Sequence, residues 1–192
     1  MKLKPLTLSD CEQVRQWRNK NLAMLRTPFM LTEDMQADFY HNVVSNRNAN
    51  ARYWGVWEDV PDTVCLYSDI QEKPIKEFEA DTKSNIFMGI IGLENISWEN
   101  RNAEISIILN PDYQRKGYGT QAVDMLLDQG FNYLNLENIY GECYYCSQSI
   151  KFWNKIIDNK NGSTAILPNR KYWNGSYFDS LYFNFTKERN DE

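Results

Sequence analysis

A short loop with two glycines, Gly117 and Gly119, lies between an apolar run and an amphipathic run of this sequence. The glycines permit close approach of the backbone to a ligand, and the free N–H groups of a helix that begins here can hold an anion. Arg115 and Lys116 add positive charge beside these groups. The segment therefore predicts a site for a phosphate or a pyrophosphate.

Two familiar phosphate-binding loops fit this segment poorly. A P-loop requires Lys-Ser or Lys-Thr after its second glycine, and neither pair follows Gly119. A Rossmann loop has the pattern G-x-G-x-x-G and follows the first strand of its domain. Here Ala122 stands at the sixth position, and the segment lies past the middle of the chain, behind an antiparallel hairpin. Both loops are therefore disfavoured.

The elements around the loop are a mixture of strands and helices. Two apolar runs, at 86–94 and 103–109, flank a polar turn and predict an antiparallel hairpin. Ser9 and Glu12 have the spacing of a capping box, which predicts a helix that begins there. Asn174-Gly175 predicts a second hairpin near the end of the chain. Further strands are predicted at 1–8, 53–57 and 138–144, and helices at 9–19, 32–44, about 120–133 and 147–157.

The glycine loop and its surroundings resemble the GNAT superfamily of acetyl-CoA-dependent N-acetyltransferases. The signature of that family, Gln/Arg-x-x-Gly-x-Gly/Ala, is matched by residues 114–119. Residues 103–114, 3–19 and 174–179 resemble the branch that includes ribosomal-protein and amino-sugar N-acetyltransferases. The resemblance covers nearly the whole chain except 58–85. It implies a mixed α/β (α+β) fold, with a mostly antiparallel sheet of six to seven strands flanked by about four helices.

The resemblance also implies that acetyl-CoA is the co-substrate, and it assigns contacts with acetyl-CoA to particular residues. The backbone N–H groups of residues 115–120 would hold the pyrophosphate, and the strand at 107–109 would pair with the pantetheine arm. The expected cofactor-binding residues are Ile107, Ile108, Leu109, Gln114, Arg115, Lys116, Gly117, Tyr118, Gly119, Thr120, Cys146, Ser149 and Trp153.

The later family motif, Asn-x-x-Ala-Ile-x-x-Tyr, aligns with residues 146–153 but differs at both ends. Cys146 replaces the asparagine, and Trp153 replaces the tyrosine that often protonates the departing thiolate. An indole N–H cannot serve as that acid. Tyr144 and Tyr145 could replace it, and Tyr144 is our candidate; a packing role is the alternative for both.

Removal of a proton from the amine is the larger chemical demand. An amine with a pKa near ~10.4 is neutral in roughly one molecule in a few thousand at pH 7. A carboxylate that acts through water meets this need. Glu104, on the strand beside the expected thioester, is the candidate base, and Glu94 on the partner strand is a weaker one. A purely structural, hydrogen-bonded Glu104 is the alternative.

The composition limits the other classes of function. The chain of 192 residues has a net charge of −5, which argues against binding of nucleic acid through its phosphates. It has no run of about 18 apolar residues that could span a membrane. The single histidine, His41, excludes His₃ and His₂-Glu zinc sites, and no metal is expected. The chain starts without a signal peptide, so we expect a cytoplasmic protein. We also expect its four cysteines to be reduced thiols: Cys11, Cys65, Cys143 and Cys146.

An acidic insertion interrupts the pattern at about 58–85. It holds eight acidic and three basic residues, so its net charge is −5 and the rest of the chain is neutral. We expect a solvated loop within one acetyltransferase domain at 1–192. A lid or a subunit contact is the alternative, because long irregular loops are often functional.

The predicted function is direct transfer of an acetyl group from acetyl-CoA to a primary amine. A small molecule or a protein N-terminus is the expected acceptor, and a homodimer is left open. A nucleotide-linked amino sugar as acceptor is one alternative. A non-catalytic CoA-binding module, suggested by Trp153, is the other.

Overall fold

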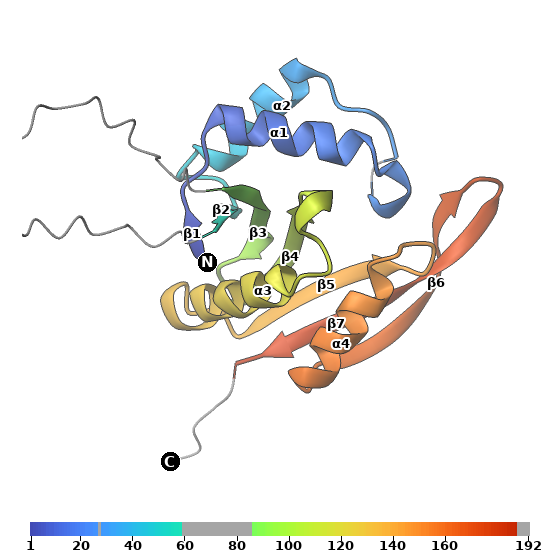
Figure 1. The fold of residues 1–192 in the computed structure, drawn as a ribbon. Coiled ribbons are helices and arrows are strands. Elements are labelled where there is room, and N and C mark those ends of the chain that lie inside the picture. Colours follow the sequence, from blue (N-terminus) through green and yellow to red (C-terminus); the bar gives the residue numbers. More distant parts are fainter. Residues whose placement is uncertain (27, 59–85, 188–192) are drawn as a thin grey trace, which may run out of the picture.

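A computed structural model describes residues 1–26, 28–58 and 86–187 (Figure 1). The predicted acidic insertion lies outside these ranges, apart from Glu58. The strands are β1 (Lys2–Lys4), β2 (Arg52–Trp57), β3 (Phe87–Ser97), β4 (Asn102–Leu109), β5 (Asn138–Tyr144), β6 (Ser163–Trp173) and β7 (Ser176–Thr186). The helices are α1 (Leu8–Asn19), α2 (Glu33–Phe39), α3 (Tyr118–Asp128) and α4 (Ile150–Asn159).

All seven of these strands form one sheet, in the order β1-β2-β3-β4-β5-β7-β6. Neighbouring strands are antiparallel except β4 and β5, which are parallel. The prediction of a mostly antiparallel sheet of six to seven strands with about four helices is confirmed. The single parallel pair lies at the centre of the sheet.

Helices cover both faces of the sheet. Figure 1 shows α1 and α2 on one face and α3 and α4 on the other. The larger apolar cluster lies between the sheet and α3 and α4, where Val123, Leu126 and Ile156 pack with Ile91 and Phe183. A smaller cluster lies under α1 and contains Leu6, Cys11, Val14, Phe87 and Ile90. These two clusters hold the central strands between the helical layers.

The predicted capping residue of the first helix is wrong by two residues. Thr7 caps α1: its hydroxyl accepts a hydrogen bond from the Asp10 amide at 3.2 Å, and the Asp10 carboxylate accepts from the Thr7 amide at 2.8 Å. Thr7 and Asp10 therefore form the capping box expected at Ser9 and Glu12. The Glu12 carboxylate instead accepts from the Arg15 guanidinium, at 2.7 Å from Nε.

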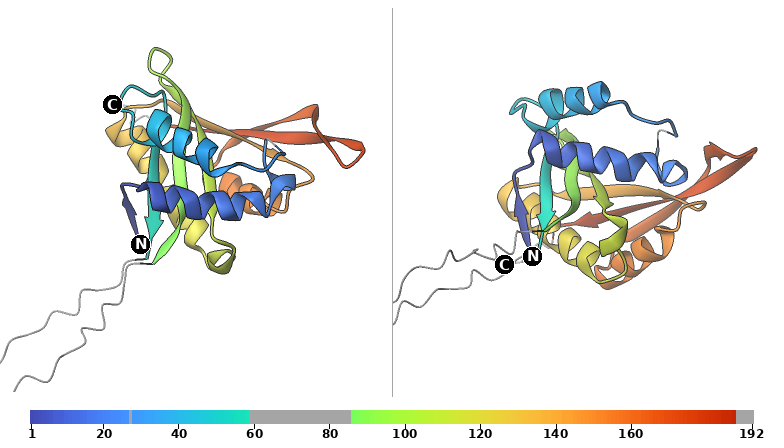
Figure 2. Two further views of the ribbon diagram at one scale, coloured as in Figure 1. Left: turned by 90° about the horizontal axis from the view of Figure 1, so that it is seen from above. Right: turned by 45° about the horizontal axis from the view of Figure 1, so that its top comes forward.

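The two predicted hairpins are confirmed. β3 and β4 pair from Gly89↔Leu109 to Ser97↔Asn102. Asn174 and Gly175 join β6 to β7 with φ values of 47° and 83°, the left-handed backbone that this turn requires. This second hairpin extends beyond the rest of the sheet (Figure 2).

The remaining helix boundaries lie close to their predictions. α3 continues as a π-helical turn to Tyr133, as far as predicted. α4 begins three residues later than predicted because the Ser147 hydroxyl accepts from the Ser149 amide at 3.2 Å and forms a turn before the helix. Within the described ranges, no helix is both long enough and apolar enough to cross a membrane.

Candidate functional site

The parallel strands β4 and β5 separate after a short paired stretch. The pairing runs only from Asn102↔Asn138 to Glu104↔Tyr140. Beyond Glu104, no strand of the described part of the chain pairs with this edge of β4, and residues 106–109 are only half-buried. An extended ligand can hydrogen-bond to such an edge as an added strand does. The predicted pantetheine-binding residues Ile107, Ile108 and Leu109 all lie on this free edge.

The loop after β4 is tied to the end of that strand. The Asn110 carboxamide oxygen accepts from the Asp112 amide at 3.0 Å, and a 3₁₀ turn follows at Pro111–Tyr113. Gln114 Nε2 then donates to the Leu109 carbonyl at 3.1 Å. Gln114 therefore holds the glycine loop against the end of β4, next to the free strand edge.

The two glycines of the loop have different roles. Gly117 is the N-cap of α3, with φ of 88°, and a Cβ added there would meet no atom within 4 Å. A Cβ added at Gly119 would lie 3.0 Å from the Phe152 ring, so this glycine allows α3 and α4 to pack. A side chain at Gly119 would therefore press on the Phe152 ring and disturb the packing of α3 against α4.

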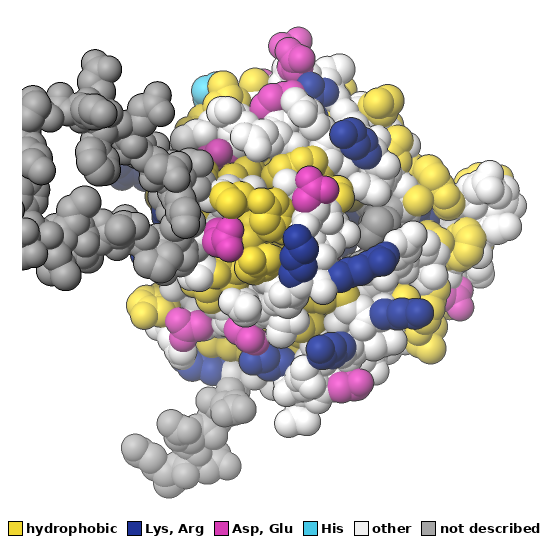
Figure 3. Space-filling view, in the orientation of Figure 1, with side chains coloured by type: hydrophobic (Ala, Val, Ile, Leu, Met, Phe, Trp, Pro, Cys, Tyr) yellow, Lys and Arg dark blue, Asp and Glu magenta, His cyan; other side chains and the backbone are white. Residues whose placement is uncertain are grey.

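The start of α3 can receive an anion. Gly117 has no side chain to cap the helix, and the first N–H groups of a helix have no intrahelical acceptor. Tyr118 and Thr120 lie in this first turn, and Arg115 and Lys116 are exposed just before it. On the face drawn in Figure 3, Lys and Arg side chains gather over the start of α3 and over α4. The predicted pyrophosphate-binding residues thus share one end of β4 with the free strand edge.

The predicted cofactor-binding residues near α4 are occupied by contacts within the protein. Trp153 is buried, with its ring 4.6 Å from that of Phe183. The Ser149 hydroxyl lies 2.7 Å from that of Ser147, and Cys146 Sγ donates to the Ala23 carbonyl at 3.8 Å. These contacts give Trp153 a packing role, while cofactor contacts by Trp153, Ser149 and Cys146 stay predictions.

The candidate base Glu104 lies on the other face of the sheet, where β4 and β5 separate. Its side chain is buried and carries a two-fold hydrogen bond from Arg26: Nη1 donates to Oε2 at 3.2 Å, and Nη2 donates to Oε1. Asn95 Nδ2 also donates to Oε2, at 3.0 Å. The Glu104 carboxylate is therefore ion-paired with Arg26 and also accepts a hydrogen bond from Asn95.

A second carboxylate, that of Glu142 on β5, lies on the same face of the sheet, and its side chain is 9% exposed. Arg170 Nε donates to it at 3.1 Å, the Ser180 hydroxyl donates at 2.6 Å, and Arg26 Nη2 lies 3.8 Å away. Burial raises the pKa of Glu142, but the hydrogen bonds from Arg170 and Ser180 and the charges of Arg170 and Arg26 lower it more. The pKa therefore lies below its usual range. Arg26 thus bridges carboxylates on both separating strands.

Tyrosines surround this pair of carboxylates. Tyr144 is buried, contacts Arg26, and has the Lys171 ammonium 4.9 Å from its ring. Burial raises the pKa of Tyr144 above its usual value, so its hydroxyl is protonated at neutral pH. Tyr53 donates to the other carboxylate considered as a base, Glu94. The predicted acid Tyr144 and the predicted base Glu104 therefore both contact Arg26.

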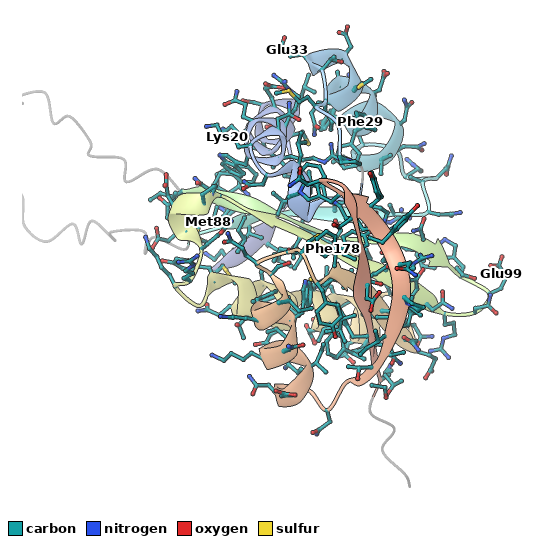
Figure 4. All side chains as sticks on the ribbon, turned by 90° about the vertical axis from the view of Figure 1, so that its right-hand side faces the viewer. Lys20, Phe29, Glu33, Met88, Glu99 and Phe178 are labelled. Atoms are coloured by element: carbon teal, nitrogen blue, oxygen red, sulfur yellow. The ribbon has the colours of Figure 1, made fainter. Side chains whose placement is uncertain are left out.

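Arg26 belongs to the connection between α1 and α2, which lies over this face. The Lys171 ammonium, on β6, donates to the Leu25 carbonyl. At its far end, the connection is held by Asn19 Nδ2, which donates to the Leu31 carbonyl at 2.9 Å. Viewed from the side of the β6–β7 hairpin, the connection that carries Phe29 lies above the hairpin that carries Phe178 (Figure 4).

Three residues of this site were not predicted from the sequence: Arg26, Glu142 and Lys171. Alternation along β5 could have indicated Glu142, because Tyr140, Glu142 and Tyr144 lie on one face of a strand. No local pattern indicates Arg26, whose partner Glu104 lies 78 residues away. In the described ranges, Cys11, Cys143 and Cys146 are free thiols, and no group of three metal-binding side chains lies together.

The sequence matches a family of known acetyltransferases. Residues 1–145 match the model of the acetyltransferase (GNAT) domain family. The chain is 31% identical over 105 residues to a spermidine N(1)-acetyltransferase of Vibrio cholerae and 32% identical over 108 residues to that of Escherichia coli K12. Each match covers 53% of this chain, and they span only 60% and 55% of the two relatives.

The fold is also similar to that of a solved structure. The Vibrio cholerae spermidine N-acetyltransferase in complex with CoA and spermine superposes with a TM-score of 0.73 and 20% identity. That superposition covers 96% of this chain and 94% of the other. The family model matches about three quarters of the chain and includes the glycine loop and the free edge of β4. The chain therefore belongs to the GNAT acetyltransferase family.

Proposed function

We propose that this protein transfers the acetyl group of acetyl-CoA to a primary amine of a small molecule. The observation that carries this proposal is the free edge of β4, which lies beside the uncapped start of α3. One end of this region suits the phosphates of CoA, and the other suits its extended arm. Spermidine acetylation by the relatives supports a small amine as the acceptor.

The proposed reaction is a direct transfer. The amine nitrogen attacks the thioester carbonyl, the C–N bond forms, and the C–S bond breaks to release CoA thiolate. The amine loses one proton, and the thiolate takes up one proton. N–H groups on the free edge of β4 would polarise the carbonyl oxygen, as in other acyl-transfer sites.

Glu104 and Tyr144 are proposed for the two proton transfers. Glu104 is positioned where β4 and β5 separate, and it would accept the amine proton through water. Tyr144 keeps its proton at neutral pH because burial raises its pKa, so it can supply a proton to the thiolate. A CoA thiol has a pKa near ~8.5, so this second step needs less help than the first.

The test measures release of free CoA from acetyl-CoA with a panel of small amines, peptides with free N-termini and amino sugars. Acetylation of small amines, verified by mass spectrometry of the product, is the expected result. Binding of acetyl-CoA without thiol release for any acceptor would instead establish a non-catalytic CoA-binding module. Absence of acetyl-CoA binding would contradict the proposal entirely.

A further inference from the structure

The Tyr53 hydroxyl joins two side chains on the face of the sheet that carries Glu104. It donates a hydrogen bond to the Glu94 carboxylate. Burial, the charge of Glu94 and the hydrogen bond to Glu94 raise the pKa of Tyr53 above its usual value, whereas a hydrogen bond with Ser106 lowers it. A hydrogen bond that lowers the pKa of a phenol favours its charged form, so the phenol oxygen is the acceptor. The Ser106 hydroxyl therefore donates to Tyr53, and Tyr53 donates to Glu94.

The register of the sheet explains how one tyrosine contacts both neighbours. Tyr53 on β2 pairs with Gly92 on β3, and Gly92 pairs with Ser106 on β4. A Cβ added at Gly92 would collide with the Tyr53 ring, so the ring lies across β3 at a place where that strand has no side chain. The Phe39 ring packs edge-on against Tyr53, with 5.1 Å between the ring centroids. Packing therefore holds the Tyr53 ring where its hydroxyl reaches both β3 and β4.

Ser106 begins this series of hydrogen bonds at the free edge of β4. The last pair between β4 and β5 is Glu104↔Tyr140, and Ser106 follows two residues later, half-buried. Alternation along β4 places its side chain on the face of Glu104 and of Ile108, which packs against the cluster under α1. Since Glu104 is the proposed base, the acceptor amine approaches the thioester from this face. The Ser106 hydroxyl therefore lies on the side from which the amine attacks.

An acceptor that arrives as an ammonium ion must lose two protons. An alkylamine with a pKa of ~10.4 is almost fully protonated at pH 7. Its nitrogen loses one proton before it attacks the thioester and a second one after the C–N bond has formed. The proposed base Glu104 accounts for one of them. We propose that Ser106, Tyr53 and Glu94 form a relay that removes the other proton, an inference that rests on the proposed function.

The hydrogen bonds run in the direction that the relay needs. The Ser106 oxygen accepts a proton from the nitrogen as its own proton moves to Tyr53 and the Tyr53 proton moves to Glu94. The nitrogen loses one proton, the Glu94 carboxylate gains one, and both hydroxyls stay neutral. Glu94 is half-buried, so its proton can pass on to the solvent. Of these three groups, Ser106 contacts the amine, and Tyr53 and Glu94 act through it.

The chain offers a matched control in Tyr140. It lies on the same face of the sheet, next to Glu104, and burial raises its pKa as it does that of Tyr53. Its ring stacks on that of Tyr182 at 5.6 Å, and within the described residues no hydrogen bond joins it to a carboxylate. Tyr53→Phe and Tyr140→Phe therefore each remove one hydroxyl from this face, but only Tyr53→Phe interrupts the relay.

The experiment compares butylamine with trifluoroethylamine, which is mostly neutral at pH 7 because its fluorine atoms withdraw electrons. A neutral amine loses only one proton, and Glu104 can take it without the relay. Tyr53→Phe and Glu94→Gln should each lower kcat/KM for butylamine about tenfold to hundredfold and kcat/KM for trifluoroethylamine less than about threefold. Tyr140→Phe should change either value less than about twofold. Equal losses for both amines in Tyr53→Phe, or no loss for butylamine, would overturn the relay.

A second comparison uses butylamine alone and does not depend on the folding of Tyr53→Phe. Ser106→Ala should lower kcat/KM about tenfold or more, and Ser106→Thr, which keeps the hydroxyl, should stay within about threefold of the wild type. Where both single variants fold, Ser106→Ala combined with Tyr53→Phe should be no slower than the slower single variant, because both interrupt one path. Equal rates of Ser106→Ala and Ser106→Thr would contradict the relay.

Failure of the relay and failure of the proposed function give different results. If the wild type acetylates no amine, the proposed function fails and the relay fails with it. If the wild type acetylates butylamine and the variants of Ser106 and Tyr53 keep full activity, only the relay fails. Glu104→Gln tests the proposed base separately, because the relay does not pass through Glu104.

Discussion

Substitution of Gly117 tests the proposed pyrophosphate site with a change of charge at nearly constant shape. Gly117 has φ of 88°, and a Cβ there would meet no atom within 4 Å. Asn and Asp tolerate this left-handed backbone better than other residues, and they have almost the same size. Gly117→Asn and Gly117→Asp therefore share the backbone cost, and they differ by one negative charge.

The expected difference follows from the exposure of the site. Two unit charges about 6 Å apart repel by about 0.7 kcal/mol at the dielectric constant of water and by about 3 kcal/mol at an effective value of 20. Residue 117 is exposed, so the lower part of this range applies to each charge of a pyrophosphate. The sum of about 1.5–3 kcal/mol corresponds to roughly ten- to hundredfold weaker binding of acetyl-CoA.

Isothermal titration calorimetry with acetyl-CoA measures this difference directly. Gly117→Asn should bind within a few-fold of the wild type, and Gly117→Asp should bind roughly ten- to hundredfold more weakly than Gly117→Asn. The difference should shrink in high salt because the repulsion is screened. Equal affinities of the two variants at low salt would show that no anion binds beside Gly117.

Three other changes test separate parts of the site. Trp153→Ala should lower the free energy of unfolding by about 3–5 kcal/mol in a denaturant titration, because the buried indole packs on Phe183. Trp153→Phe should keep most of the acetyl-transfer rate. Loss of the rate in a stably folded Trp153→Phe variant would instead give the indole a role in the reaction. Tyr144→Phe should lower kcat about tenfold or more, because the variant lacks the proposed acid. The wild-type kcat should decline at alkaline pH as the Tyr144 phenol, whose pKa is raised above the usual 10.0, loses its proton, and this decline should be absent from the variant. An unchanged kcat–pH profile would exclude Tyr144 as the acid. Glu142→Gln should lower the Tm at neutral pH, because a carboxyl whose pKa is lowered on folding stabilises the folded state only while it is ionised. The Tm difference from the wild type should disappear as the pH falls below the usual pKa of 4.5. A Tm difference that persists in acid would contradict the ion pair as its cause.

The glycine loop of the proposed cofactor site and the last hairpin were predictable because their signals are local. Gly117 and Gly119 indicated a loop before a helix, and Asn174-Gly175 indicated a tight hairpin; both features are present. The start of α1 was misplaced because Thr7 and Asp10 have the same capping spacing as Ser9 and Glu12. Competing local signals of similar strength are resolved only by the surrounding packing.

The carboxylate side of the candidate site was less predictable because its contacts join distant parts of the chain. The ion pair of Arg26 with Glu104 spans 78 residues, and the hydrogen bond from Lys171 to Leu25 spans 146. Glu104 was identified from its strand, but its partner could not be, since an arginine in an irregular connection has no periodicity. The glycine loop is contiguous in sequence, whereas the carboxylate site exists only in the folded chain.

Hydrogen exchange of backbone amides, measured with and without acetyl-CoA, tests the location of the cofactor most directly. Acetyl-CoA should slow exchange at residues 105–109, where the edge of β4 has no partner in the described structure, and at residues 115–120, at the start of α3. The turn at Asn174-Gly175, which ends the β6–β7 hairpin, should be unaffected. Protection elsewhere, with exchange at 105–109 and 115–120 unchanged, would contradict the proposed binding of acetyl-CoA at this edge.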